Sequence, residues 1–349
     1  MIKKLGICVM VLGLAACAPQ EKGELPQSNE VVAVQTGNQT QEGQRIVEVE
    51  LSDSPEVAAT YTAKMQPMDP AKVYPFFNSP ALVDEEPNDE VGIRQIFSDG
   101  SDLSYTDGYL TLYLPRVKYA NSFTGLLQDD GGNDTEIEGF SREEAEQIGE
   151  DLFRELGIQG MNLKAIHGMK ADEIIAQIAD EDTAIIEKDG TKTELTGQVA
   201  DSYYLQYTQS LDGIKLSEAN IYNENPNTLA PGANALLIID REGLAFANLN
   251  GIAGEWKKES EKDLINQQKA VDVVLEQLQQ DEFKREGELV ESNLNLQGKK
   301  SLISELFQGS TMKYSPVWEV KIKITNQKGD MVTEDVINYY VDAVTGELL

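Results

Sequence analysis

The sequence offers few side chains of the types that catalysis needs. It has a single histidine, His167, and two cysteines, Cys8 and Cys17. A zinc peptidase motif needs two histidines one helical turn apart, and zinc sites built on three histidines, or on two histidines and a glutamate, are excluded for the same reason. A Ser-His-Asp triad would have to use His167, yet no G-x-S-x-G turn supplies its serine. We therefore expect no catalytic residue, no metal site and no cofactor, and we interpret His167 as a partly buried strand residue.

Carboxylates are the remaining candidates for chemistry. A glycosidase needs two of them about 5–9.5 Å apart on either side of a sugar cleft, and no feature of the sequence singles out such a pair. The loop Asp129–Asp134 carries oxygen ligands that Ca²⁺ could use, but it lacks the spacing and the closing glutamate of an EF-hand. We interpret this loop as a solvated acidic turn and keep a carboxylate hydrolase as a third alternative.

The charge of the chain excludes several classes of partner. There are 29 basic and 60 acidic residues, which gives a formal charge of −31. A surface this acidic repels nucleic acid and anionic lipid headgroups, and neither of the glycine-rich nucleotide-binding motifs occurs. At 40% hydrophobic residues the chain can bury a core, and its 349 residues suggest two or three domains.

The N-terminus has the features of a secretory signal peptide. Lys3 and Lys4 precede an apolar run over residues 5–16, which is shorter than the roughly 20 residues of a membrane-spanning helix. The run ends at Leu14-Ala15-Ala16-Cys17, which resembles the lipobox of bacterial lipoproteins. The resemblance implies removal of the signal peptide 1–16 and acylation of Cys17. It further implies a lipoprotein anchored on the extracytoplasmic face of the cell membrane.

A polar segment follows the expected lipid. Residues 17–45 are rich in Gln, Glu, Asn, Gly, Ser and Thr and contain no aromatic residue, so they cannot bury enough apolar surface to fold. We interpret them as a flexible tether with a root-mean-square span of roughly 30 Å.

The sequence pattern of the remaining residues predicts an α+β protein. Residues 46–125 read as a β-rich N-terminal domain, with a short helix capped by Asp69 and a hairpin turn at Asp107-Gly108. Two units follow, over residues 141–255 and 256–349, each with a helix before several antiparallel strands.

Local signals define the elements of these two units. In the first, Ser141 and Glu144 form a capping box, Gly157 ends the helix, and residues 240–243 read as a four-residue hairpin loop. In the second, Ser260 is expected to cap a helix. A half-buried strand then carries an alternating series, namely Trp318, Val320, Ile322 and Ile324.

Two stretches resemble known extracytoplasmic domains. The segment Tyr204–Gln209, three further residues and then Gly213–Leu216 is similar to the FTP propeptide repeat of thermolysin-like proteases, although Lys215 stands where that pattern has proline. The C-terminal segment Val341–Leu348, preceded by Trp318-Glu319-Val320, resembles the closing strand and Thr-Gly-Glu turn of PepSY domains. Together they cover about residues 201–349 and imply two PepSY-like (cystatin-like) units, as in YycI-type envelope regulators.

The resemblance implies a non-catalytic binding or regulatory protein whose partner is an envelope protein or a cell-wall component. The alternative is a solute- or glycan-binding lipoprotein of a transport system. A convex surface with an exposed strand edge would favour the first function. A cleft rimmed by aromatic residues would favour the second, and a matched pair of carboxylates in a cleft would favour the hydrolase.

Overall fold

The computed structural model describes residues 55–77, 80–88, 92–117, 132–179, 185–186, 192–193, 199–217, 232–280, 286–300, 311–328 and 331–349. The expected signal peptide, Cys17 and the tether lie outside this range, as do residues 129–131 of the acidic loop. Within the part of the chain that is described, no helix is long and apolar enough to cross a membrane.

Strands dominate the described structure. Most belong to one sheet: β1 (Val57–Met65), β2 (Leu82–Asn88), β3 (Gly92–Phe97), β4 (Asp102–Thr106), β5 (Tyr109–Tyr113), β6 (Met161–Met169), β9 (Ser202–Leu211), β10 (Ile214–Leu216), β11 (Asn234–Asp240), β12 (Gly243–Asn250), β13 (Ala253–Asp263), β14 (Glu286–Lys300), β15 (Thr311–Lys328) and β16 (Met331–Asp342). The short strands β7 (Ile185–Ile186) and β8 (Lys192–Thr193) pair separately. The helices are η1 (Pro70–Lys72), η2 (Tyr74–Phe76), η3 (Pro115–Val117), α2 (Arg142–Leu156), α3 (Ala171–Ala179) and α4 (Gln267–Gln280).

The fourteen strands form a single mixed sheet in the order β13-β1-β15-β14-β10-β9-β11-β12-β5-β4-β3-β2, with β16 on β15 and β6 on β9. The α+β prediction, with two helix-packed units after a separate β-rich domain, is therefore wrong: the fold is mostly β. Strand β12 of the expected first unit pairs with β5, and β1 pairs with both β13 and β15. These pairings satisfy strand edges that separate units would have left open.

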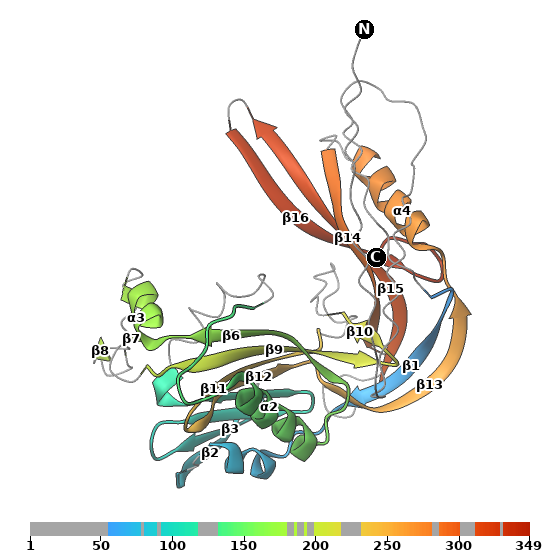
Figure 1. The fold of residues 1–349 in the computed structure, drawn as a ribbon. Coiled ribbons are helices and arrows are strands. Elements are labelled where there is room, and N and C mark those ends of the chain that lie inside the picture. Colours follow the sequence, from blue (N-terminus) through green and yellow to red (C-terminus); the bar gives the residue numbers. More distant parts are fainter. Residues whose placement is uncertain are drawn as a thin grey trace, which may run out of the picture.

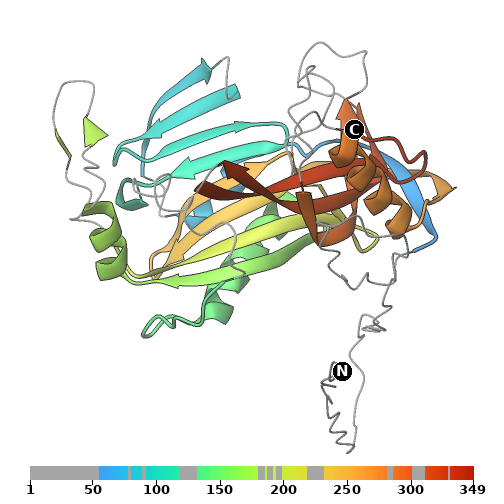
Figure 2. The same ribbon diagram turned by 90° about the horizontal axis from the view of Figure 1, so that it is seen from above.

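The sheet bends into two parts that meet at an angle (Figure 1). One part contains β2 to β6, β9, β11 and β12, and α2 packs beneath it. The other part, formed by β14, β15 and β16 with α4 on its outer side, rises from one end of the first. Seen from above, β15 and β16 cross over the middle strands of the first part, and the blue strands β2 to β4 lie to one side of them (Figure 2). The face of the first part that is turned away from α2 therefore lines the inner side of the angle.

Several local predictions are confirmed. The hydroxyl of Ser141 accepts a hydrogen bond from the Glu144 N–H, and the Glu144 carboxylate accepts one from the Ser141 N–H, which completes the capping box of α2. Gly157 ends this helix with a φ of 71°. Asp69 caps η1 through a bond from Ala71 N–H.

Two local predictions are wrong. Ser260 does not begin a helix but pairs with Thr60 inside β13; α4 starts at Gln267, and the side chain of Asn266 caps it by accepting from the Lys269 N–H at 2.8 Å. The hairpin between β11 and β12 has a two-residue turn, because Asp240 already pairs with Gly243. Strand β13 was missed because its exposed residues, mostly Lys and Glu, carry no apolar alternation.

The C-terminal strands follow the predicted pattern. The alternating residues from Trp318 to Ile324 are all buried against α4, and the Trp318 indole N–H donates to the carbonyl of Ile265 at 3.1 Å. Asp342 then closes the terminal turn: its carboxylate accepts from the N–H groups of Val344 and Thr345, both at 2.9 Å. The turn exists as the sequence suggested, while the PepSY resemblance stays a prediction.

Candidate binding surface

His167 lies inside the sheet rather than in a cleft. It sits on β6 opposite Tyr204 of β9, is fully buried, and its ring centroid is 6.0 Å from that of Tyr204. Ser202 and Asp240 occupy the same face on the next strands. Here the serine lies between the histidine and the aspartate, whereas a catalytic triad needs the histidine in the middle. The three residues therefore do not form a hydrolase triad.

Asp240 is committed to another partner. Its carboxylate is almost fully buried and accepts two bonds from the guanidinium of Arg116, at 2.5 and 3.1 Å. A third bond, of 2.8 Å, comes from the N–H of Glu242 and shapes the β11–β12 turn. A buried carboxylate held by a bidentate arginine is fixed in position, so this pair ties η3 to the end of β11.

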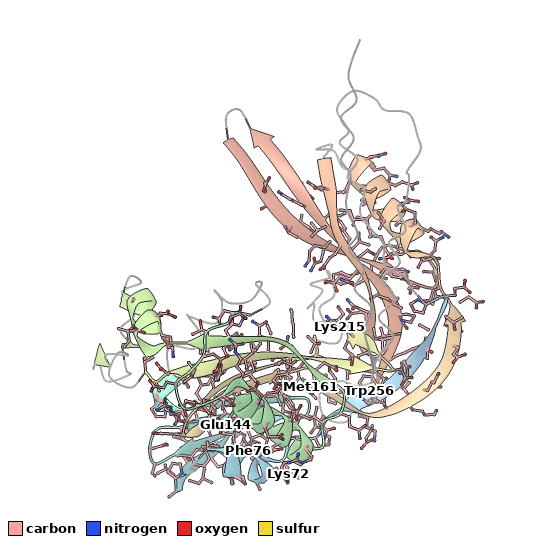
Figure 3. All side chains as sticks on the ribbon, in the orientation of Figure 1. Lys72, Phe76, Glu144, Met161, Lys215 and Trp256 are labelled. Carbon is pink, nitrogen blue, oxygen red and sulfur yellow. The ribbon has the colours of Figure 1, made fainter. Side chains whose placement is uncertain are left out.

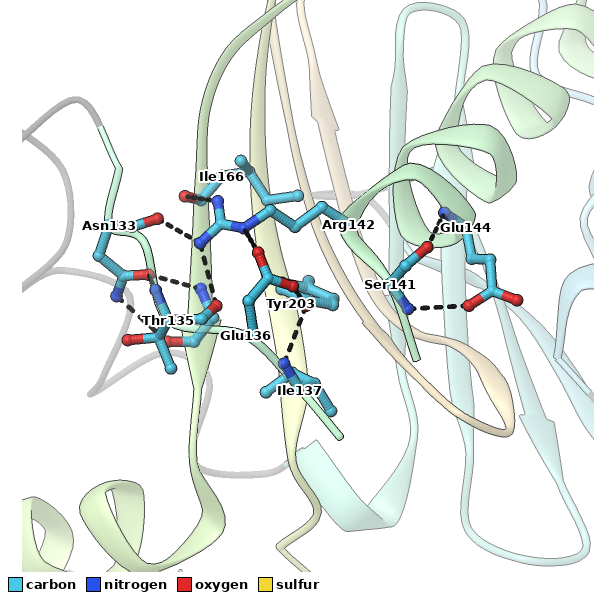
Figure 4. Close-up of polar contacts among 10 residues, drawn as sticks. Asn133, Thr135, Glu136, Ile137, Ser141, Arg142, Glu144, Ile166 and Tyr203 are labelled. Atoms are coloured by element: carbon cyan, nitrogen blue, oxygen red, sulfur yellow. Dashed lines mark hydrogen bonds and ion pairs between the residues drawn. The ribbon is translucent and has the colours of Figure 1, made fainter. Parts of the chain in front are cut away.

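The densest polar cluster surrounds Arg142, the first residue of α2 (Figure 4). Its guanidinium donates to four acceptors: the carboxylate of Glu136 at 2.9 Å and the carbonyl oxygens of Thr135 at 2.9 Å, Ile166 at 3.4 Å and Asn133. Tyr203 extends the network, because its hydroxyl donates to Glu136 at 3.1 Å and accepts from the Ile137 N–H at 3.0 Å. Four protein acceptors leave the guanidinium little capacity for a ligand. The cluster therefore fastens residues 133–137 to β6 and β9.

No metal site is found in the described ranges, where no group of three His, Cys, Asp or Glu side chains lies close enough to hold an ion. In the described end of the acidic loop, Asn133 is occupied structurally: its side-chain oxygen accepts from the N–H of Gly168 at 2.8 Å and from that of Thr135 at 3.2 Å.

The inner angle of the sheet carries a compact group of ionised and polar side chains. Lys215 on β10 lies there (Figure 3) and pairs in parallel with Asn295 of β14. The Asn295 amide donates to Glu319, and so does the Tyr340 hydroxyl at 3.3 Å. Burial, reinforced by Glu319, raises the pKa of Tyr340 above its ordinary value. Asn295 and Tyr340 both bind Glu319 and so hold β14, β15 and β16 together.

A different surface lies on the first part of the sheet, opposite α2. The ring of Tyr207 packs on Phe153 of α2, so its neighbours Gln206 and Thr208 point to the other face. Strand register extends each of them into a row across the sheet. One row contains Ser104, Thr111, Asn248, Leu236 and Gln206; the other contains Asn250, Asn234, Thr208 and Asn162. We call these nine residues the polar face. Beyond Ser104 the first row continues into Arg94 of β3.

The polar face carries no charged side chain. Eight of its nine members have hydroxyl or amide groups. Six members are half-buried, Asn162 is exposed, and Gln206 and Thr208 are buried. The face of β14–β16 that is turned away from α4 differs, because it carries a ladder of ion pairs such as Lys321–Glu291 at 2.7 Å and Lys323–Glu334 at 2.7 Å. The lysine hydrogen bond lowers the pKa of Glu291. The chain as a whole has a formal charge of −31, so the lack of charged side chains is specific to the polar face.

Two tyrosines border the polar face on β5. Tyr109 and Tyr113 each lie two residues from Thr111, so all three side chains point to the same side of the sheet. The ring of Tyr113 packs edge-on against Phe246 at 4.9 Å, and burial raises the pKa of Tyr109 to about 12. Beyond them, the ion pair between Arg94 and Asp102 marks the charged end of this surface.

The free edge of β2 is the other exposed feature. Leu82 and Val83 are 47% and 65% exposed, and β2 pairs only with β3 among the described strands. The edge also carries three acidic residues, Pro87 and a register shift between Leu82 and Asp84. These features normally prevent a strand edge from pairing with another chain, so we assign the edge no partner.

Comparison with known proteins gives the fold alone. No protein-family model matches the chain, and no curated protein matches it. Among solved structures, it is similar to an uncharacterized protein from Eubacterium rectale ATCC 33656, with a TM-score of 0.62 and 14% sequence identity over 86% of this chain and 90% of that one. At 14% sequence identity, this similarity shows only that the two proteins share a fold.

The residues of the polar face were not singled out by the sequence. They come from six strands spread between residues 104 and 250, and each strand shows only an ordinary polar alternation. The missing signal was the absence of charge at these alternating positions, which becomes visible only after the strand register brings the rows together.

Proposed function

We propose that this chain is a non-catalytic, extracytoplasmic binding protein, held to the membrane by a lipid on Cys17, and that it takes its ligand on the polar face. The observation that carries the proposal is the uncharged double row of hydroxyl and amide side chains on the inner side of the bent sheet. Such groups both donate and accept hydrogen bonds and can hold a polar ligand without ion pairing.

The chemistry of the other clusters supports a binding role. The carboxylates and cations around Arg142, Asp240 and Glu319 are engaged with one another, and His167 is buried. The lipobox-like segment and the polar tether supply the expected attachment, with the folded part standing off the membrane. The ligand would then be a component of the envelope or a solute passing through it.

A photo-crosslinking residue tests the proposal in intact cells. It replaces Asn248 on the polar face of the full-length protein, and in a matched control it replaces Lys262, which is exposed on β13. We expect a specific adduct from position 248 and none from position 262. Equal adducts from both positions, or no adduct from position 248, would refute binding at this face.

A further inference from the structure

We infer that the ligand of the polar face is an uncharged polysaccharide; the inference rests on the proposed function and names its ligand class. The first argument is chemical complementarity. The face contains three hydroxyl and five amide side chains. Two of them, Gln206 and Thr208, are buried, and the six that solvent reaches are Ser104, Thr111, Asn162, Asn234, Asn248 and Asn250. A chain of sugar hydroxyls also combines donors and acceptors at every unit, so the two surfaces match group by group.

Charge excludes the competing polymers. An anionic glycan, a nucleic acid or a phosphate-rich polymer would meet cations that are already paired: Arg94, which continues the first row, with Asp102 and Glu86, and the β15 lysines across the angle with glutamates. It would also approach a chain of charge −31. A cationic ligand would find no carboxylate among these nine residues to pair with. A neutral ligand alone meets neither repulsion nor an unpaired charge.

The dimensions favour an oligosaccharide over a single sugar. The row from Ser104 to Gln206 crosses five adjacent strands. Four interstrand spacings correspond to about 19 Å. Tyr109 and Tyr113 border the row on β5, and a tyrosine presents an apolar body with a polar tip. This combination suits a sugar, whose ring has apolar C–H faces and polar edges.

Composition argues against a protein as the occupant. Protein interfaces are enriched in aromatic residues, Met and Arg at their centres. The nine residues of the polar face contain none of these and have one apolar member, Leu236; Tyr109, Tyr113 and Arg94 lie at the border. The experiments must therefore be able to detect a protein bound at this face as well.

Native gel electrophoresis of the detergent-solubilised full-length protein tests the ligand class. The gels contain dextran, starch, xylan, barley β-glucan or mannan as neutral probes and alginate as the anionic probe. We expect at least one neutral polysaccharide to retard the protein and alginate to leave it unaffected. Asn248→Asp should weaken the retardation about tenfold, the equivalent of one hydrogen bond.

The matched control is Gln279→Glu, which makes the same amide-to-carboxylate change on the exposed side of α4 and should keep full retardation. Circular dichroism of both variants establishes that they are folded. Retardation by none of the neutral probes, retardation by alginate, or an equal loss in Gln279→Glu would overturn the inference. If no neutral probe binds while position 248 still gives a protein adduct in cells, the binding face stands and its ligand is a protein; if both experiments are negative, both proposals fail.

Discussion

The side-chain amide of Gln209 and the backbone of Ala253 form a closed pair of hydrogen bonds. Gln209 Nε2 donates to the Ala253 carbonyl at 2.7 Å, and the Ala253 N–H donates to Gln209 Oε1 at 3.0 Å. A further bond, of 2.9 Å, runs from Nε2 to the carbonyl of Gln159. Both Gln209 and Ala253 are buried. Where β9 passes the start of β13, the Gln209 side chain therefore takes the place of the backbone hydrogen bonds of a strand pair.

Replacing Gln209 should therefore be costly. Gln209→Leu keeps the size of the side chain but leaves the buried N–H and C=O of Ala253 without this partner, and we expect the free energy of unfolding to fall by about 3 kcal/mol. Urea unfolding measures the change. Gln279→Leu, on the exposed side of α4, is the control and should have little effect. A Gln209→Leu variant as stable as this control would contradict the structural role.

Gly149 makes room for the hydroxyl of Tyr207. A methyl group at position 149 would lie 2.7 Å from this hydroxyl oxygen and 3.1 Å from Leu237 Cδ1, which is overpacking. We expect Gly149→Ala to destabilise the protein by about 1 kcal/mol, since the clash outweighs the better helix propensity of alanine. Thermal unfolding with calorimetry provides the measurement.

The companion change is Tyr207→Phe. The Tyr207 hydroxyl is buried and has no hydrogen-bond partner within the described structure, so its removal should cost little. The double variant should recover about 1 kcal/mol relative to Gly149→Ala, because the clashing oxygen is gone. Strictly additive effects of the two changes would show that the contact does not limit stability.

Local chemistry explains which elements the sequence predicted correctly. The capping box at Ser141 and Glu144, the glycine stop at Gly157 and the Asp107-Gly108 turn depend on residues a few positions apart. Long-range pairing explains what was missed. Nothing near Tyr61 indicates that it will pair with Tyr314, and nothing near Leu112 indicates that it will pair with Ala247. The single sheet is built from such pairings, and hence the prediction of separate units failed.

The polar face depends on pairing between strands far apart in the sequence even more strongly than the fold does. Thr111 and Asn248 are adjacent only because β5 pairs with β12 across more than a hundred residues of sequence. By contrast, the single histidine is enough to exclude a zinc site built on two or three histidines. The arrangement of His167, Ser202 and Asp240 became visible only with the strand register. The absence of a catalytic function itself stays a prediction.

The turn between β9 and β10 allows a test of backbone strain. Asp212 and Gly213 both have positive φ, at 49° and 80°, as a two-residue hairpin turn of this type requires. A side chain at Gly213 would meet no atom within 4 Å, so only the backbone conformation opposes substitution. Gly213→Val should lower the free energy of unfolding by about 1–3 kcal/mol. Gly213→Asn is the matched control and should cost less, because asparagine tolerates positive φ; equal losses in both variants would contradict this explanation.

Lipid attachment is tested at the two cysteines. The lipobox-like segment predicts that Cys17→Ser abolishes labelling with a fatty acid and releases the protein from the membrane fraction or leaves an uncleaved precursor. Cys8→Ser lies inside the expected signal peptide and should leave labelling and localisation unchanged. Persistent labelling of Cys17→Ser would exclude acylation at this residue.

Alkaline pH should destabilise the protein through its buried tyrosines. Burial raises the pKa of Tyr109 to about 12 and raises the pKa values of Tyr207 and Tyr314 as well. In the unfolded chain a tyrosine loses its proton near pH 10. Because the folded protein holds these protons to higher pH, the associated stability is complete below about pH 10 and is lost as the pH rises from about 10 through 12.

Urea unfolding at a series of pH values between about 8 and 11 measures this loss, and Tyr109→Phe isolates one contribution to it. The variant should lose less stability than the unchanged protein above about pH 10, whereas lysine deprotonation affects both proteins equally. Ultraviolet titration of the phenolates gives an independent check: native protein should titrate at higher pH than protein unfolded in urea. Coincident titration curves for the two states would contradict the burial of these phenols.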